Sequence, residues 1–489
     1  MQSLDYIIIV VFFLLLIGIG IYSYFKVSSS ADFFTAGGKL PWWLSGISHH
    51  VSGYSGAVFV AYASIAYTHG FVMYVWWALT ISIAMIGTIF FIAPRWARLR
   101  SKTGIQSPTE YLATRYNLPT QQLMAWSGVI VKLFDVGAKW AAVGILLHAF
   151  MGVPIVTGII LSGVVTLFYV TLGGLWADVL NDFVSFLIQV ASGLVMFVIV
   201  IMRLGDGPAG VLTMWDRLPP ENSQLFNSPY TVWFAVAFLV INFFSYSGGT
   251  WNLATRFISS PSGKDAKKAA ILSAVLYLIW PLILFYPMFA APLFFPNLAS
   301  PETSYSLMAM EFLPTGLLGL LVASLLSTTL SMTSSDANTI SSVITRDILP
   351  VIFKKVKSYN KKQLLLLARV TTFGFIVLTI LIAFNAQSFG GVIGLIITWF
   401  AALLGPISIP MILGLLPAFK HSGSTAAILS IVGGLATFLL MKFFPDLDVA
   451  LTLASPLIVS LLLYIGYAFL LKPKVPAAVE KLLTDINQD

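Results

Sequence analysis

Long apolar stretches separated by short polar segments run through the whole chain. A helix needs about 20 mostly apolar residues to cross the hydrocarbon of a bilayer, and we find about thirteen stretches of that kind. The pattern therefore predicts an all-α polytopic membrane protein. We expect its spans at roughly 5–25, 41–64, 71–95, 121–150, 153–173, 182–203, 230–256, 267–293, 311–344, 364–385, 390–416, 423–443 and 448–471.

The composition agrees with a chain dissolved in lipid. Hydrophobic residues make up 58% of it and charged residues only 9%, with a mean hydropathy of +0.91. A soluble protein carries about 25% charged residues. Cysteine is absent, so disulfides and thiolate metal sites are excluded. The first apolar run follows Asp5 rather than a Lys or Arg, and we interpret it as a retained span.

The net charge of +8 is explained by where the basic residues lie. They gather in the segments 95–102, 264–268 and 354–362, and all three fall on one side of the membrane if the N-terminus is outside. The positive-inside rule then places the N-terminus outside and the C-terminus inside. We therefore expect a multi-pass protein of the inner (cell) membrane whose charge reflects topology, with the lipid bilayer and no nucleic acid as partner.

Two spans carry a Tyr-Ser-Gly sequence at matched positions. The second span contains it within 52–56 and the seventh within 245–250. Gly weakens a helix interior, and transporters often place their binding site where two helices unwind near the membrane midplane. The sequence predicts such a break in both spans. The alternative is that these small residues only permit close helix packing.

The ninth span is unusually rich in hydroxyl groups. Ser324, Ser327, Thr328 and Ser331 recur at spacings of three and four, which places them on one helix face. A face of hydroxyl oxygens opposite an unwound helix is a plausible sodium site. The alternative is that each hydroxyl bonds back to a carbonyl one turn earlier.

Several charges fall inside predicted spans, where they are costly and functional by default. Asp135 and Lys139 are spaced as i and i+4 in the fourth span, which also holds Lys132. Either the two form a structural pair, or Asp135 faces the solute. Asp182 begins the sixth span. We expect Asp336 near the cytoplasmic end of the ninth span, partly solvated.

Two longer stretches resemble the sodium/solute symporter family, which includes bacterial galactose, proline and sialic-acid symporters. They are Gly152–Ala177, with its glycine pair, and Ser324–Ser335 followed by Thr345–Ile348. Shorter matches are Ser55-Gly56, Arg256, Gly405-Pro406 and Gly414. The resemblance implies a leucine-transporter-type fold with five plus five inverted repeats. It divides the chain into an extra N-terminal helix (1–35), a first repeat of five helices (36–205), an outer loop (206–229), a second repeat of five helices (230–418) and two C-terminal helices with a short cytoplasmic tail (419–489).

The same resemblance implies a sodium site. Its ligands are the carbonyls of Val51, Tyr54 and Ser324 and the hydroxyls of Ser327 and Thr328. A second cation site, present in some relatives, would use Asp182 and Ser331 together with a hydroxyl at position 330. That position is Leu330 here, so we favour one sodium ion, Na+, per solute.

The expected solute pocket departs from that of the galactose-type members. Gly53, Val58 and Trp77 stand where those members have amide and acidic side chains, and Tyr277 stands at their pocket lysine. An acid at 135 suits an amine, a zwitterion or a polyol. Aromatic residues in such a chain can equally be ordinary core or lipid-facing groups. The solute-binding residues we predict are Ser55, Trp77, Asp135, Lys139, Tyr246, Tyr277 and Trp399.

Together these features predict a sodium-coupled symporter that imports a small polar organic solute by alternating access, functional as a monomer. The solute is a sugar or polyol, an amino acid or another amine-bearing compound. One alternative is proton coupling through Asp135, Asp182 or His50. A remoter one is a transporter-like sensor, although the tail after Lys472 is short for a signalling domain. An enzyme is not expected, because the metalloprotease and serine-hydrolase motifs are absent.

Overall fold

The computed structural model describes residues 1–385, 405–441, 443–444 and 449–488. Across these ranges the secondary structure is helical, apart from an isolated bridge between Asn227 and Tyr230. The helices of the first half are α1 (Ser3–Tyr24), α2 (Ser30–Thr35), α3 (Trp42–Val51), α4 (Ala61–His69), α5 (Thr80–Gly87), α6 (Ala93–Thr103), α7 (Leu112–Arg115), α8 (Leu118–Met151), α9 (Ile155–Leu204) and α10 (Gly210–Thr213).

The second half has a similar make-up. Its helices are α11 (Val232–Phe244), α12 (Asn252–Ile258), α13 (Gly263–Phe294), α14 (Ser304–Phe312), α15 (Leu317–Val343), α16 (Leu349–Ile352), α17 (Lys361–Ala383), α19 (Gly405–Leu413), α20 (Ser424–Met441), α21 (Val449–Leu471) and α22 (Ala477–Asn487). Short 3₁₀ or π turns join them: η1 (Ala36–Gly38), η2 (Gly56–Phe59), η3 (Tyr74–Leu79), η4 (Thr88–Ile92), η5 (Gly207–Ala209), η6 (Met214–Arg217), η7 (Pro220–Ser223), η8 (Ser245–Gly249), η9 (Pro301–Thr303), η10 (Ile344–Ile348), η11 (Lys354–Ser358) and η14 (Pro417–Phe419).

Nine helical segments among the described residues are long and apolar enough to cross a membrane. The expected number was about thirteen, and the difference has identifiable sources. The second span is divided into α3, η2 and α4, so no single piece of it is long enough. The span expected at 390–416 is described only in its second part, where α19 lies. Helix α9 covers two expected spans as one segment, and α8, where the span 121–150 was expected, is not among the nine. The full count of thirteen therefore stays a prediction.

Helix α9 is a run of 50 residues that contains a kink at Gly174. A straight helix of that length would extend about 75 Å, more than twice the hydrocarbon thickness. Gly174 has φ 52° and ψ −137°, which is not a helical conformation. A Cβ at this position would collide with the carbonyl oxygen of Phe33, so only glycine fits the kink. The kink separates the two spans that the sequence predicted on either side of the glycine pair.

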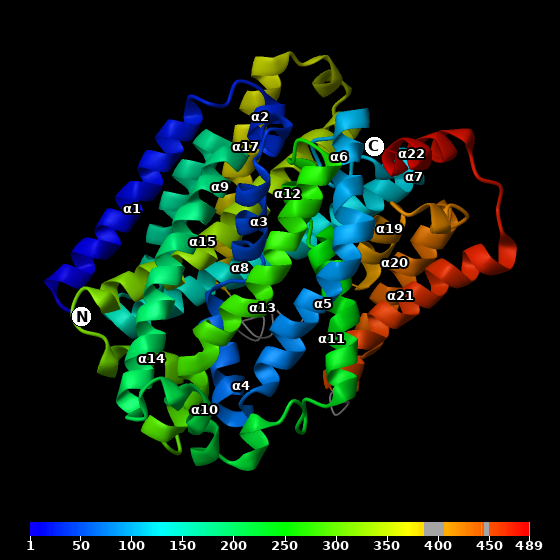
Figure 1. Cartoon of the computed structure of the whole chain (residues 1–489). Helices are drawn as coiled ribbons and strands as arrows, with labels where there is room; N and C mark the ends of the chain where they lie inside the picture. The colour runs from blue at the N-terminus through cyan, green and yellow to red at the C-terminus, as the bar shows by residue number, and fades with distance from the viewer. Residues whose placement is uncertain (386–404, 442, 445–448, 489) are drawn as a thin grey trace.

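Helix α15 forms the centre of the bundle, while α1 covers its outside (Figure 1). Every residue from Leu321 to Val343 is buried, including all those that bear a hydroxyl group. Its small Ser and Thr side chains let neighbouring helices approach closely. The N-terminus of α15 is capped by a residue distant in sequence. The Asp5 carboxylate accepts hydrogen bonds from the backbone N–H groups of Gly316 (2.7 Å) and Gly319 (2.9 Å).

The basic segments lie at one end of the helices. In Figure 1, the end of α6, the start of α13, the turn before α17 and the C-terminal helix α22 are found together, away from the first residue of α1. Helix α22 is amphipathic and packs its buried side chains against α6 and α7. This grouping agrees with the predicted placement of the basic loops on one side. Which side faces the cytoplasm stays a prediction.

Candidate ion and solute site

Both predicted helix breaks are present. The second span stops being helical after Val51 and resumes with the 3₁₀ turn η2 at Gly56. In the seventh span, the π turn η8 contains Gly248 at φ 115°, and Trp251 at φ 71° precedes α12. Because non-helical backbone inside a membrane must find new hydrogen-bond partners, each break exposes groups that another element has to satisfy.

Side chains from other helices satisfy three carbonyls of the first break. The Tyr277 hydroxyl donates to the carbonyl oxygen of His50 (2.8 Å), and the Tyr246 hydroxyl donates to that of Gly53 (3.0 Å). The Asn252 amide donates to the carbonyl of Ser52 (3.2 Å). A Cβ on Gly53 would overlap the Tyr277 hydroxyl, so the missing side chain at 53 makes room for the tyrosine. This contact explains why the chain departs from the galactose-type pattern at both positions together.

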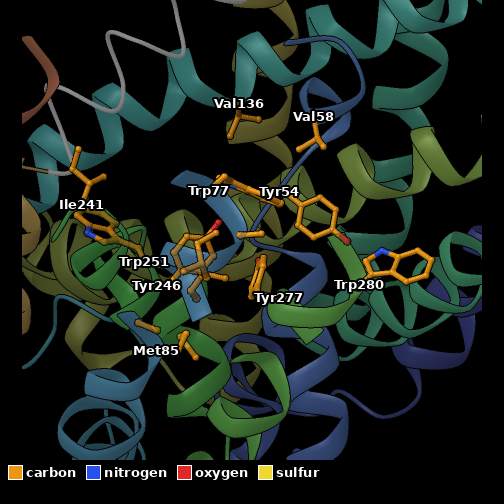
Figure 2. Packing of buried hydrophobic residues seen from close by; sticks show 14 of the residues in the cluster. Tyr54, Val58, Trp77, Met85, Val136, Ile241, Tyr246, Trp251, Tyr277 and Trp280 are labelled. Atoms are coloured by element: carbon orange, nitrogen blue, oxygen red, sulfur yellow. The ribbon is translucent and has the colours of Figure 1, made fainter. Parts of the chain in front are cut away.

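Three of the predicted solute-lining residues lie side by side (Figure 2). The rings of Tyr246 and Tyr277 are 5.1 Å apart between centroids, and those of Trp77 and Tyr277 are 5.9 Å apart. Tyr54 joins the group at 5.7 Å from Trp77. All four side chains are buried. We call Trp77, Tyr246 and Tyr277 the aromatic wall.

The other predicted solute residues lie elsewhere. Ser55 is in the first break and is buried. Asp135 and Lys139 belong to a separate group of charges on α8. Trp399 lies outside the described residues.

The first break faces α15. The backbone N–H of Gly56 donates to the Thr329 hydroxyl (2.8 Å), and the hydroxyls of Ser52 and Ser335 are 3.0 Å apart. These two contacts show that the segment runs antiparallel to α15. Residues 53–55 therefore lie level with about 330–334. Among the serines predicted to bind a cation, the one closest to the middle of the break is Ser331, which was predicted for the second cation site rather than for the sodium site.

The serine and threonine predicted as sodium ligands bond back along their own helix. The Ser327 hydroxyl donates to the carbonyl of Ser324 (2.8 Å), and the Thr328 hydroxyl contacts the carbonyls of Ser324 and Leu325 (2.9 Å each). This is the local bonding that the sequence left open as an alternative. Each hydroxyl oxygen keeps lone pairs that can still accept a cation.

A second group of charges lies beside the break. Arg256 on α12 places one guanidinium nitrogen 2.6 Å from a carboxylate oxygen of Asp178 and 3.0 Å from one of Asp182. All three side chains are completely buried. Because Asp178 and Asp182 are four residues apart on α9, both face the arginine from one helix face.

Serine hydroxyls surround these carboxylates. Ser48, Ser52 and Ser331 donate to Asp182. Ser334 and Ser335 donate to Asp178. The structure thus brings together the two residues predicted for a second cation, Asp182 and Ser331, but it places the Arg256 guanidinium on the same carboxylate. We call Arg256, Asp178, Asp182 and these five serines the arginine cluster.

A third group of charges joins α8 to α15. The Lys132 ammonium is 3.0 Å from Asp135 and 2.7 Å from Asp336. The Lys139 ammonium is 2.8 Å from Asp135 and 2.5 Å from Asp336. We call these four residues the lysine–aspartate ring. Asp135 and Lys139 therefore form an ion pair, which was one of the two alternatives that their spacing left open.

The expectation that Asp336 would be partly solvated is wrong. Its side chain has no exposed surface, because α15 is buried along this whole stretch. The carboxylate is tolerated there because two ammonium groups neutralise it. The sequence analysis did not predict that Asp178 and Arg256 form a buried ion pair. The signal available was two acids four residues apart in one apolar span and a lone arginine near another.

The fold is that of known membrane transporters. The structure resembles a substrate-bound, outward-open Na+-coupled sialic acid symporter with a TM-score of 0.83, at 20% identity over 96% of this chain and 99% of that one. It also resembles a transporter of the nucleobase-cation-symport-1 family in a closed conformation, with a TM-score of 0.60 at 16% identity over 94% of this chain and 99% of that one. Both likenesses define the fold, a polytopic helical bundle of the predicted leucine-transporter type.

The family follows from the sequence comparison. Residues 33–434 match the sodium:solute symporter family, and the chain belongs to it. It is 24% identical to the sodium/glucose cotransporter of Vibrio parahaemolyticus, over 91% of this chain and 86% of that relative. It is also 24% identical to a sodium/sialic acid symporter of Aliivibrio fischeri, over 91% of this chain and 89% of that relative. With the human sodium/iodide cotransporter the identity is 26%, over 82% of this chain and 63% of that relative.

Membership settles the general activity. The protein is a sodium-coupled symporter of solutes in a membrane, with sodium as its coupling ion, and its relatives are transporters rather than enzymes. The proton-coupled alternative finds no support in these relatives.

Proposed function

We propose that this protein imports a small, uncharged polar organic solute together with one sodium ion, by alternating access across the cell membrane. It does so as a monomer with its N-terminus outside. The observation that carries the proposal is the break of the second span lying against the hydroxyl-rich face of α15. Main-chain carbonyls freed from a helix and hydroxyls from a neighbouring one are the oxygen ligands that sodium needs.

The sodium ion binds between these two elements. Its main-chain ligands are the carbonyls of Val51 and Tyr54, at the two ends of the break. On α15 the predicted ligands are Ser324, Ser327 and Thr328, and the contacts of Ser52 and Gly56 favour Ser331 as a further ligand. The negative charge of Asp182, which accepts from Ser331, adds to the attraction.

An uncharged solute suits the groups that line the site. Asp135 is already neutralised by two lysines, so it does not offer a free carboxylate to an amine. The aromatic wall presents apolar faces and hydroxyl groups. Sugars and polyols combine apolar faces with hydroxyls, and we favour them over amine-bearing compounds.

Sodium entry supplies enough energy for accumulation. A cation moving inward gains about 2.3 kcal/mol per 100 mV, and a tenfold sodium gradient adds about 1.4 kcal/mol. One sodium ion therefore drives accumulation of the solute by several hundredfold at most.

Uptake into proteoliposomes of the purified protein tests the proposed solute and ion. Glucose, myo-inositol, proline, sialic acid and iodide would each be offered with an inward sodium gradient, and again with potassium in its place, at fixed pH. We expect sodium-dependent uptake of glucose or myo-inositol and little of iodide. Uptake that ignores sodium and follows a pH gradient would refute sodium coupling, and exclusive uptake of proline or iodide would refute the solute class.

Single substitutions on α15 test the ion site. Ser331→Ala and Thr328→Ala should each raise the half-saturating sodium concentration about fivefold, as expected for the loss of one ligand oxygen worth about 1 kcal/mol. Ser342→Ala is the matched control, because the Ser342 hydroxyl bonds only along its helix to the Thr339 carbonyl among the contacts described. Unchanged sodium affinity in both test variants would remove α15 from the site.

A further inference from the structure

The hydroxyl of Tyr54 lies at the centre of a polar group that the sodium site does not use. It donates to the side-chain oxygen of Gln189 on α9 (2.7 Å) and lies 3.3 Å from the Nε2 atom of His50 on α3 (Figure 2 shows it pointing toward the indole of Trp280 on α13). We call Tyr54, His50, Gln189 and Trp280 the Tyr54 polar cluster. It is contributed by the first break and three different helices.

Three polar atoms of this cluster lack a hydrogen-bond partner among the residues that the structure describes. They are Nε2 of Gln189, Nδ1 of His50 and Nε1 of Trp280. The side chains that carry them are almost fully buried, at 1%, 0% and 5% exposure. Buried polar groups in folded proteins are nearly always satisfied, so three unsatisfied atoms around one hydroxyl indicate a missing partner.

The missing partner must be an oxygen acceptor. The indole N–H can only donate, and the amide nitrogen of Gln189 offers two hydrogens. His50 can donate or accept at Nδ1, according to its tautomer. A hydroxyl meets these demands, because its oxygen accepts two hydrogen bonds and its hydrogen can be donated; a carboxamide oxygen also accepts two hydrogen bonds.

The partner must also be uncharged. A cation would face N–H donors rather than oxygens. A carboxylate would be repelled by the arginine cluster, because two carboxylates and one guanidinium give that cluster a net negative charge. The cluster lies close by, since it includes Ser52, which precedes Tyr54 by two residues. Burying an unpaired charge here would be costly.

The cluster adjoins the proposed solute site. The Tyr54 ring lies 5.7 Å from Trp77 and 6.3 Å from Tyr277, two members of the aromatic wall. We propose that the Tyr54 polar cluster binds an uncharged oxygen of the transported solute, a hydroxyl or a carboxamide, with Trp280 and Gln189 as its donors. This inference rests on the proposed function and specifies which end of the solute the cluster holds.

Two conservative variants test the cluster. Trp280→Phe removes the indole N–H and keeps an aromatic ring, and Gln189→Leu removes the amide at similar volume. Trp76→Phe is the matched control, because Trp76 also has a buried, unsatisfied Nε1 but stacks on Tyr230 at 6.0 Å, and none of its described ring contacts is with the Tyr54 polar cluster. Size-exclusion profiles of all variants would establish that each is folded.

The measurements separate this inference from the proposed function. Sodium-driven transport currents in proteoliposomes and thermal stabilisation in detergent would both be recorded with glucose, myo-inositol and glutamine, and with a deoxy analogue of whichever sugar or polyol binds. We expect each test variant to raise the half-saturating concentration of the bound compound about five- to tenfold. The control should stay within twofold, and the deoxy analogue lacking the bound hydroxyl should lose no further affinity in Trp280→Phe.

Several results would overturn it. Wild-type half-saturation in both folded test variants would show that the cluster holds only water, while the proposed function stands. Stabilisation that the variants abolish, without sodium-dependent current in the wild type, would retain the cluster and refute the symport of these compounds. Neither stabilisation nor current with any compound would refute both.

Discussion

The lysine–aspartate ring and the arginine cluster both place charged side chains in the middle of the helix bundle, yet they differ in their balance of charge. The ring has two ammonium groups and two carboxylates, each ammonium in contact with both acids. The arginine cluster has one guanidinium for two carboxylates, and five serine hydroxyls donate to those acids.

The difference separates a structural role from an electrostatic one. A neutral ring needs nothing further and joins α8 to α15 as a fixed contact. The arginine cluster retains one carboxylate in excess, and its Asp182 accepts from Ser331, on the face of α15 that we propose for sodium. A surplus of negative charge in a medium of low dielectric raises the affinity of a nearby site for a cation.

The largest effect should come from removing one carboxylate from each group. Asp336→Asn leaves the ring with an unmatched ammonium and should cost about 3–5 kcal/mol of stability. Asp182→Asn leaves Arg256 paired with Asp178 and should cost only about 1 kcal/mol. Thermal unfolding of the purified variants, followed by size-exclusion chromatography, measures both. Equal losses would show that charge balance does not distinguish the two groups.

A balanced deletion sharpens the first test. The double variant Lys132→Met/Asp336→Leu leaves the pair Lys139–Asp135 intact. It should recover most of the stability that Asp336→Asn loses, because apolar replacements of buried ion pairs are often close to neutral. If the double variant were as unstable as the single one, the contacts of the individual groups would matter more than their balance.

The next effect concerns sodium. Asp182→Asn removes a negative charge near the proposed ion, so sodium binding should weaken and the half-saturating sodium concentration should rise about tenfold, or about 1.4 kcal/mol. The Hill coefficient for sodium should stay at about one. The double variant of the ring, which changes no net charge, should keep its sodium dependence within twofold. A Hill coefficient that falls from two to one in Asp182→Asn would instead reveal a second sodium ion.

The smallest effect should come from one hydroxyl of the arginine cluster. Ser334→Ala removes a donor to Asp178 while Ser335 still donates to the same carboxylate (2.9 Å). The loss of stability should be about 1 kcal/mol or less. Thermal unfolding at low and high sodium would measure it, and a loss as large as that of Asp336→Asn would mean that the hydroxyls, rather than Arg256, neutralise these acids.

The local features of the site were predictable from the sequence. The Tyr-Ser-Gly segments predicted two breaks, because Gly and Ser have a low helix propensity. The spacing of Asp135 and Lys139 predicted a possible pair, since i and i+4 meet on a helix surface. The boundary predicted between the spans 153–173 and 182–203 includes Gly174, where the structure has the kink in α9.

Long-range contacts were not predictable in the same way. Asp336 joins Lys132 and Lys139 across 204 and 197 residues, and nothing in the local pattern pairs them. The sequence also did not predict which turn of α15 lies opposite the first break. A helix face repeats every three or four residues, so the row of hydroxyls predicted the face but left open which turn lies opposite the break.

The contact of Asp5 with the start of α15 has a consequence for how the protein is made. The two partners are 311 residues apart, so α1 acquires this contact only after another 311 residues have been synthesised. Helix α1 also packs against α9, a partner that is synthesised earlier, so its two main neighbours become available at different stages of synthesis.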